Sequence, residues 1–358
     1  MNVLHAKVAR QPLRHALPPV DPADRDGAGK RGLFGGDGHR IVAVGVGDNQ
    51  ARFRLLVCPW LLVQLPPAVG DALAVRRPAE AHHLAVERLL FDAHAAEWAS
   101  PYGLVGLLVA GAAARHRSGG EPALLTAPTN AEVTSYWVRA GFFREAAELF
   151  EIHGRVPKGK PREESDVLLP VTAVRAAEDV HEVVSKIQQR ASTILASELQ
   201  LDPKATMGFA MALSEACQNI VEHAGVGGWV AVQSYNWRRK LARRVVVIAV
   251  GDAGVGFRHS LEPTQAKRFG DRWGDAAALE AALIQGVSRF RDPGRGQGLA
   301  GIRRYLARWD GKIAIRSGTA RIAIVPKWDD DVPLKEGLPT FPGAQVLIII
   351  PEQGSAKR

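Results

Sequence analysis

Cysteine and long apolar runs are what this sequence has least of. Cys58 and Cys217 are its two cysteines, which is too few for a disulfide framework or a cysteine-based zinc site and fits a reducing cytoplasm. No apolar run reaches the ~18 residues of a membrane span, and the run at 346–351 is short enough to predict a buried strand. The N-terminus lacks the apolar segment of a secretory signal. We therefore expect a cytoplasmic protein with no membrane anchor.

A DNA-binding module is also missing, although the chain is basic, with a formal net charge of +9. Its arginines are scattered, for example in pairs at 243–244 and 303–304, and basic residues do not alternate with aromatic ones as they do in nucleic-acid interfaces. A positive charge permits binding of acidic partners without establishing it. We expect an arginine-rich surface and no direct contact with nucleic acid.

The length of 358 residues, with 46% hydrophobic and 23% charged residues, is typical of a chain with about two globular domains. The first stretch is rich in Pro, Gly, Arg and Asp and has no lasting hydrophobic period, which predicts disorder. A polar stretch with several prolines follows further along and is typical of a linker. The predicted parts are a disordered N-terminal extension (1–38), a first domain (39–155), a linker (156–165) and a second domain (166–354).

Strands and helices alternate in both predicted domains, which indicates an α/β fold. The first domain is predicted to contain apolar segments at 40–47, 52–65 and 83–94, a helix from Pro101 to the glycines at 119–120, a strand at 122–128, and a helix from Asn130 to Gly141. The second is predicted to contain strands at 165–173, 245–250, 312–316, 320–325 and 344–350, and helices at 175–199, 204–224, 275–290 and up to Trp309.

Within the predicted helix at 204–224, Glu215 and Asn219 are four residues apart, and Cys217 lies on the opposite, apolar face. A carboxamide oxygen is a suitable ligand for magnesium. A neighbouring carboxylate could orient or deprotonate a nucleophile close to a phosphate. The alternative is an ordinary solvated helix face, with Cys217 in the core.

The apolar strand at 245–250 leads directly into Asp252, Gly254 and Gly256. A strand that is apolar throughout is buried on both faces, so it places Asp252 at the rim of a core. A buried carboxylate needs hydrogen-bond donors, and an adenine amino group is one. The glycines would let the backbone pass close to a base and ribose. The alternative is a simple turn after a strand.

A third glycine stretch begins with Gly294, Gly296 and Gly298 and leads into a helix, which suits binding of a triphosphate by backbone N–H groups. Together with Gly301 it also matches G-x-G-x-x-G. A dinucleotide site would need a strand directly before the glycines and an acidic residue ~20 positions later. Neither is present, because the preceding stretch is polar and contains Pro293. We therefore expect Gly301 to serve helix packing.

The three motifs, in this order, resemble the GHKL ATP-binding superfamily, which includes DNA gyrase, MutL and histidine kinases. The resemblance covers residues 166–352, is strongest to the anti-sigma-factor serine kinases, and implies a GHKL (Bergerat) two-layer α/β sandwich with a mixed sheet. It implies that ATP and Mg²⁺ bind, with Asn219 coordinating Mg²⁺, Asp252 contacting adenine, Glu215 acting as catalytic base and 258–293 forming a lid. The residues implied to bind the nucleotide are Asn219, Asp252, Gly254, Gly256, Gly294, Arg295, Gly296, Gly298 and Leu299; a solvated Arg295 is the alternative.

The first domain resembles a STAS-like α/β sandwich, the fold of anti-sigma antagonists, in the order of its elements and in the small residues before the helix at 101–120. In such antagonists a serine or threonine near this helix start is phosphorylated, and Ser100 is the nearest counterpart. The alternative is a helix cap that precedes Pro101. The resemblance implies a protein partner, a sigma factor or a STAS-type antagonist, and leaves a homodimer open.

Three other functions compete with a kinase. A sensor histidine kinase would need its phosphorylated histidine on a helical hairpin, but His181 lies within the predicted ATPase domain. A mechanical ATPase of the gyrase type would need a further domain after the glycines, for which the chain has little room. A non-catalytic, ATP-dependent binding module would not need Glu215. We expect an ATP-binding regulatory protein, and an ATP-dependent protein serine/threonine kinase or ATPase is favoured.

Overall fold

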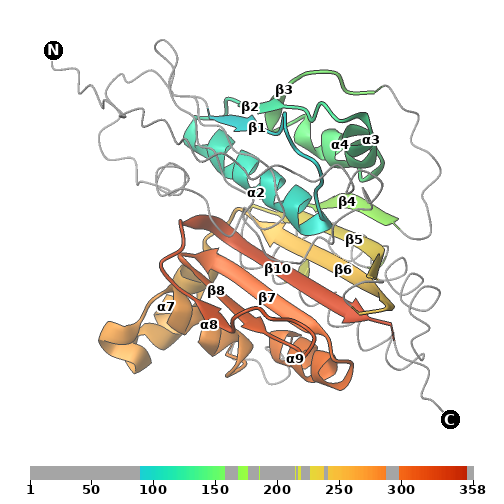
Figure 1. Cartoon of the computed structure of the whole chain (residues 1–358). Helices are drawn as coiled ribbons and strands as arrows, with labels where there is room; N and C mark the ends of the chain where they lie inside the picture. Colours follow the sequence, from blue (N-terminus) through green and yellow to red (C-terminus); the bar gives the residue numbers. More distant parts are fainter. Residues whose placement is uncertain are drawn as a thin grey trace, which may run out of the picture. The chain divides into compact units, whose positions relative to one another are not determined.

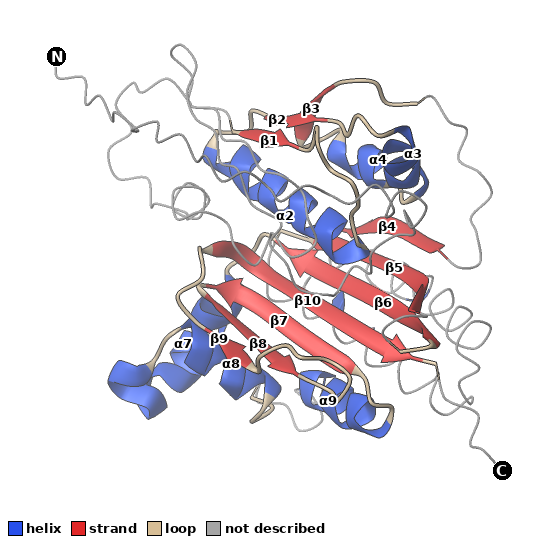
Figure 2. Ribbon diagram, in the orientation of Figure 1, coloured by secondary structure: helices blue, strands red, loops and turns tan. Residues whose placement is uncertain are grey.

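The computed structural model describes residues 89–157, 168–175, 226–237, 241–287 and 298–352, together with Ser185, Ser214, Cys217 and Gln218. All of them lie in one compact unit, His39–Arg358. They form a three-stranded parallel sheet and a seven-stranded antiparallel sheet with helices (Figures 1 and 2). The predicted α/β class is confirmed, whereas the division into two domains at 155–166 stays a prediction.

The smaller sheet comes first in the chain, and its strands lie in the order β1-β2-β3 with parallel pairs throughout. Parallel neighbours require crossover connections, and here helices supply them. Asn130 caps α3, because its side chain accepts hydrogen bonds from the backbone N–H groups of Glu132 and Val133. The elements are β1 (Leu90–Asp92), α2 (Pro101–Arg117), β2 (Ala123–Thr126), α3 (Ala131–Arg139), α4 (Phe142–Ala146) and β3 (Phe150–His153).

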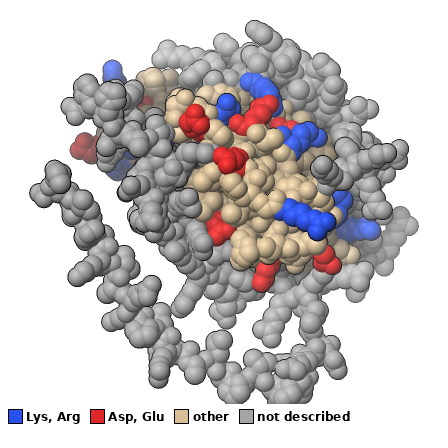
Figure 3. Space-filling model, turned by 90° about the horizontal axis from the view of Figure 1, so that it is seen from above, with Lys and Arg blue, Asp and Glu red and all other residues tan. Residues whose placement is uncertain are grey.

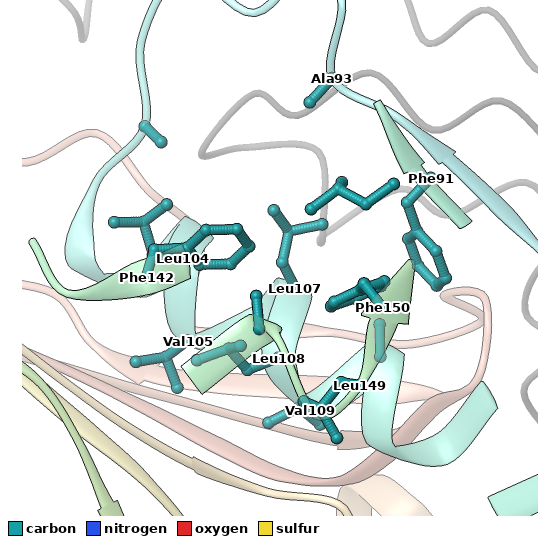
Figure 4. Packing of buried hydrophobic residues seen from close by; sticks show 14 of the residues in the cluster. Phe91, Ala93, Leu104, Val105, Leu107, Leu108, Val109, Phe142, Leu149 and Phe150 are labelled. Carbon is teal, nitrogen blue, oxygen red and sulfur yellow. The ribbon is translucent and has the colours of Figure 1, made fainter. Parts of the chain in front are cut away.

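Helix α2 is apolar on nearly all sides and buried accordingly. Its start matches the prediction, with Ser100 as cap and Pro101 in the first turn, and it ends just before Gly119 and Gly120. Gly111 allows close contact with β3, since a Cβ there would lie 2.2 Å from the Phe150 ring. Figure 4 shows this packing between α2 and the small sheet.

The larger sheet has the strand order β4-β5-β6-β10-β7-β8-β9, and every neighbouring pair in it is antiparallel. The mixed sheet predicted from the sequence is therefore wrong for these strands. The reason is that β10 inserts between β6 and β7 and runs opposite to both. The strands are β4 (Leu168–Val174), β5 (Gly228–Trp237), β6 (Arg243–Asp252), β7 (Lys312–Gly318), β8 (Ala320–Ile324), β9 (Leu334–Lys335) and β10 (Phe341–Pro351).

The two faces of the larger sheet pack against different helices. One face contributes Val246, Ile248 and Val250 to a core that also contains Cys217 and residues of the helices after β6. The other face packs against α2, whose Val105 and Val109 lie over Gly251. These helices are α7 (Gly256–Phe269), α8 (Asp275–Leu283) and α9 (Gly298–Arg308), with a short 3-10 turn, η3 (Gly270–Arg272), between α7 and α8.

The contact between α2 and the larger sheet includes a buried polar bond. The Gln345 side-chain Nε2 on β10 donates to the backbone oxygen of Tyr102, at 2.6 Å, and both residues are buried. The resemblance implies a two-layer sandwich for residues 166–352. In the structure, α2, which precedes this region, covers the second face of the larger sheet.

Several elements differ from the predictions. The sequence predicts no helix between Asp252 and residue 275, but 256–269 is helix α7. Helix α8 ends at Leu283, earlier than predicted, because Gly286 adopts a positive φ of 68° and terminates it. Strands β3 and β5 were not predicted, and the predicted helices at 175–199 and 204–224 lie almost wholly outside the described residues.

Among the described residues, no helix is long and apolar enough to cross a membrane. The surface seen from above in Figure 3 carries Lys, Arg, Asp and Glu side chains interspersed with one another.

Candidate functional site

The candidate site begins where β6 ends, at Asp252. The residues from Val245 onward in this strand are buried, and Asp252 itself is 4% exposed. In register it lies opposite Gly228 on β5 and Ala344 on β10. The side chains of β6 alternate between the sheet faces, so Asp252 is on the same face as Val250 and the core around Cys217.

Among the described residues, the groups that donate to Asp252 are backbone N–H groups and not cations. Its Oδ1 accepts a hydrogen bond from the Gly254 backbone N–H at 2.9 Å. Burial raises the pKa of the Asp252 carboxyl to about 7, and the backbone N–H groups of Gly254 and Ala344 offset part of that rise. Within the described part of the chain no Lys or Arg pairs with it. The raised pKa indicates that these donors do not fully satisfy the carboxylate, so its oxygens can accept further hydrogen bonds from a ligand.

Two glycines let the chain fold tightly around this carboxylate. Gly343 has φ +64°, and a Cβ there would lie 2.1 Å from the Asp252 backbone oxygen. Gly256 has φ +70°, and a Cβ there would lie 2.6 Å from the Ser317 Oγ. Both positions combine a left-handed backbone with no room for a side chain, so only glycine fits. Of the two, only Gly256 was a sequence candidate.

Ser317 is a site residue that the sequence reasoning missed. It lies on β7, is 3% exposed, and its Oγ donates to the Gly343 backbone oxygen at 2.7 Å. The same Oγ accepts from the Phe257 backbone N–H at 3.1 Å. Ser317 therefore ties β10 to the turn that follows Asp252. No local signal in the strand could have revealed it, because its partners lie on β10 and at the start of α7.

The segment between Asp252 and the third glycine stretch is anchored to the sheet at α8. The Asp275 Oδ2 accepts from the Thr319 backbone N–H at 2.8 Å and from the Thr319 Oγ1 at 2.7 Å. At the other end of α8, Arg303 on α9 donates from Nη1 to the Ile284 backbone oxygen at 3.0 Å. The described part of the region predicted as a lid thus includes α7 and α8, and α8 is tied to the turn between β7 and β8 and to α9.

The structure describes some of the remaining predicted site residues and not others. Glu215, Asn219, Gly294, Arg295 and Gly296 lie outside the described residues. Gly298 is the first residue of α9, and the half-buried Leu299 packs against the core on the Asp252 face of the sheet. Gly254 lies in the turn after Asp252.

Cys217 is helical and fully buried in the core next to the sheet. Burial raises the pKa of its thiol to about 12, so this cysteine is a core residue and not a reactive thiolate, as the sequence predicted. Among the described residues, no group of three or more His, Cys, Asp or Glu side chains could hold a metal ion. Asn219, the predicted magnesium ligand, is not among them.

Ser100 acts as a helix cap in this structure. Its Oγ accepts from the Gly103 backbone N–H at 3.1 Å, and the residue is 7% exposed. A kinase would need access to this hydroxyl, which the packing of α2 withholds. The capping alternative is therefore the one that the geometry favours.

No protein-family model matches the chain, and no curated protein matches it.

Proposed function

We propose that this protein is an Mg-ATP-binding regulatory protein similar to the anti-sigma-factor serine/threonine kinases of the GHKL superfamily. Its second domain would hold the nucleotide, and the preceding STAS-like part would take part in signalling to a protein partner, a sigma factor or a STAS-type antagonist. The proposal rests on the sequence motifs and on the surroundings of Asp252.

One observation carries the proposal: Asp252 and the buried Cys217 lie on the same face of the larger sheet. Cys217 is helical and sits midway between Glu215 and Asn219 in sequence. This arrangement supports a nucleotide site that includes Asp252 and the helix that carries Cys217, on which Glu215 and Asn219 are the proposed catalytic base and magnesium ligand.

In this site the ionised Asp252 carboxylate would accept a hydrogen bond from the amino group of adenine. Asn219 would coordinate Mg²⁺, and the backbone N–H groups around Gly294, Gly296 and Gly298 would hold the triphosphate. Glu215 would accept the proton of the partner's serine hydroxyl as that oxygen attacks the γ-phosphorus and ADP leaves.

The first test is nucleotide binding by the full chain, measured by calorimetry with ATP and GTP in the presence of Mg²⁺. We expect ATP to bind more than tenfold tighter than GTP, because GTP has a carbonyl where adenine has its amino group. Asp252→Ala and Asn219→Ala should each weaken ATP binding by at least tenfold, whereas Glu121→Ala, which removes an exposed carboxylate just before β2, should leave it unchanged. Unchanged binding in both site variants would falsify the proposal.

ATP affinity, measured in the same way, should depend on pH. The pKa of Asp252 is about 7 in the protein without nucleotide, so its carboxyl becomes protonated as pH falls through 7. We expect ATP affinity to drop by about tenfold between pH 8 and pH 6. An Asp252→Asn variant that still binds weakly should show no such slope.

The kinase part of the proposal needs a separate test, because ATP binding alone also fits a non-catalytic module. Labelled ATP and candidate STAS antagonists are incubated with the wild-type chain and with Glu215→Ala. Label transfer that disappears in Glu215→Ala supports the catalytic role. Transfer that survives excludes Glu215 as the base, and no transfer to any antagonist favours the binding module.

A further inference from the structure

A cavity of about 1030 Å³ opens at the carboxyl ends of the three parallel strands of the smaller sheet. His94 follows β1, Thr129 follows β2, and Gly154 and Arg155 follow β3, so all three strand ends contribute to its wall. The first turn of α3 completes it. Crevices outside the carboxyl ends of parallel strands are where α/β proteins most often bind small ligands.

The cavity is lined by His94, His153 and Arg155 among others. None of the described residues that line it is Asp or Glu. Neither the His94 ring nor the Arg155 guanidinium makes a hydrogen bond or ion pair within the described part of the chain. The His153 Nε2 lies 3.1 Å from a carboxylate oxygen of Glu151, and both side chains are about half exposed. Among the described residues, two side chains thus have free donor atoms at the cavity.

The rest of the wall is preformed. The Thr129 Oγ1 donates to the His94 backbone oxygen at 3.0 Å, which joins the loops after β1 and β2. The Ala127 N–H donates to the His153 backbone oxygen at 2.7 Å, which joins the loop after β2 to the end of β3. Ala127, Pro128 and Val156 supply apolar surface. Loops that are held together in this way lose little freedom when a ligand binds.

We propose that this cavity binds a small phosphate-bearing molecule with an apolar portion. The planar guanidinium of Arg155 matches two phosphate oxygens, and the rings of His94 and His153 supply further donors. The apolar wall residues would cover the uncharged part of the ligand. The inference goes beyond the proposed ATPase function, because none of the residues lining the cavity belongs to the site around Asp252.

The test uses the full chain and inorganic phosphate as the probe, with the ring signals of His94 and His153 followed by NMR. We expect saturable changes of both rings, with potassium chloride at equal ionic strength as the blank. Arg155→Gln should weaken phosphate binding by at least fivefold. Arg139→Gln is the matched control, because Arg139 is on α3 and donates to the Ser135 Oγ at 2.7 Å, and it should bind phosphate like the wild type.

Two further arms distinguish this cavity from the site around Asp252 and from a site for carboxylates. The titration is repeated in Asp252→Ala, where the histidine signals should respond to phosphate as in the wild type. Succinate replaces phosphate in another arm; a saturable response to succinate with none to phosphate would overturn the phosphate assignment. The proposal is also overturned if the response to phosphate is linear and equals that to chloride, or if Arg155→Gln, with an unchanged circular dichroism spectrum, binds as tightly as the wild type.

Discussion

Asp252 at the end of β6 and Asp331 in the loop between β8 and β9 are both buried carboxylates, but their surroundings differ in charge. Asp331 accepts from the Lys312 Nζ at 2.7 Å and from the Arg321 Nη2, and its side chain is 3% exposed. Burial alone would raise the pKa of the Asp331 carboxyl, but the hydrogen bonds and charges of Lys312 and Arg321 outweigh it and lower the pKa to about 2.

Asp252 is buried to a similar extent, yet its donors among the described residues are backbone N–H groups and its pKa is raised to about 7. A carboxylate matched by cations is satisfied by the protein itself and stabilises the loop that carries it. A carboxylate with only backbone donors has remaining capacity for a ligand. The comparison explains why Asp252 is a candidate for function and Asp331 is not.

The largest expected effect comes from removing a cation of the Asp331 cluster. Lys312 is 2% exposed and contacts both Asp329, at 2.8 Å, and Asp331. Lys312→Met leaves two buried carboxylates with one cation fewer, so we expect a loss of about 4 kcal/mol in the free energy of unfolding. Urea denaturation measures it. Lys335→Met, at a 36% exposed side chain 3.8 Å from Asp331, should cost less than about 1 kcal/mol.

The second largest effect should be the loss of the stability that Asp331 contributes as the pH falls. Its folded pKa lies below the unfolded value, so the stability that it contributes is present above about pH 4 and is lost as pH falls toward 2. The expected contribution is roughly 2 kcal/mol. The check is the difference in unfolding free energy between wild type and Asp331→Asn at several pH values. A difference that stays constant from pH 6 to pH 2 would contradict this assignment.

The stability contributed by Asp252 should change with pH in the opposite direction to that of Asp331. Its folded pKa is raised, so the wild type is favoured at low pH and loses stability as pH rises toward 7. At pH 8 we expect Asp252→Asn to be more stable than the wild type by on the order of 2 kcal/mol, and the gain should vanish near pH 4. Thermal unfolding at both pH values checks this. A variant that is less stable at pH 8 would show that Asp252 is satisfied by the protein.

The smallest effect concerns the serine that positions the turn after Asp252. Ser317→Ala removes the bonds to the Gly343 oxygen and from the Phe257 N–H, which should cost about 1 kcal/mol. We also expect ATP affinity to fall severalfold. Ser118→Ala is the control, because the Ser118 Oγ also bonds the backbone, at the Arg115 and Glu121 oxygens, but Ser118 is only partly buried and lies outside the site around Asp252. Loss of stability with unchanged ATP binding would limit Ser317 to a structural role.

The elements with strong end signals could be predicted from the sequence. Pro101 and the glycines after Arg117 mark α2, Asn130 marks α3, and the apolar run before Asp252 marks β6. Helix α7 was missed because it buries little more than Ser260 and Leu261 and contains Pro263. Its apolar period is too weak to recognise.

The packing partners could not be predicted in the same way. Lys312 and Arg316 alternate with Ile313 and Ile315 along β7, a pattern typical of a face in water. Instead Arg316 is fully buried, donates to the Pro339 backbone oxygen at 2.6 Å and lies over the Phe341 ring. Nothing local in the strand indicates that tertiary contacts cover its polar face. Ser317 was missed for the same reason, since its partners are on β10 and at the start of α7.

Helix α2 is covered on one side by the smaller sheet and on the other by β5, β6 and β10. A protein cut between residues 157 and 168 would leave an apolar side of α2 in one fragment and bare strands in the other. The two sheets are therefore expected to melt in one cooperative thermal transition. The fragments, expressed apart, should be insoluble, and co-expression should rescue both.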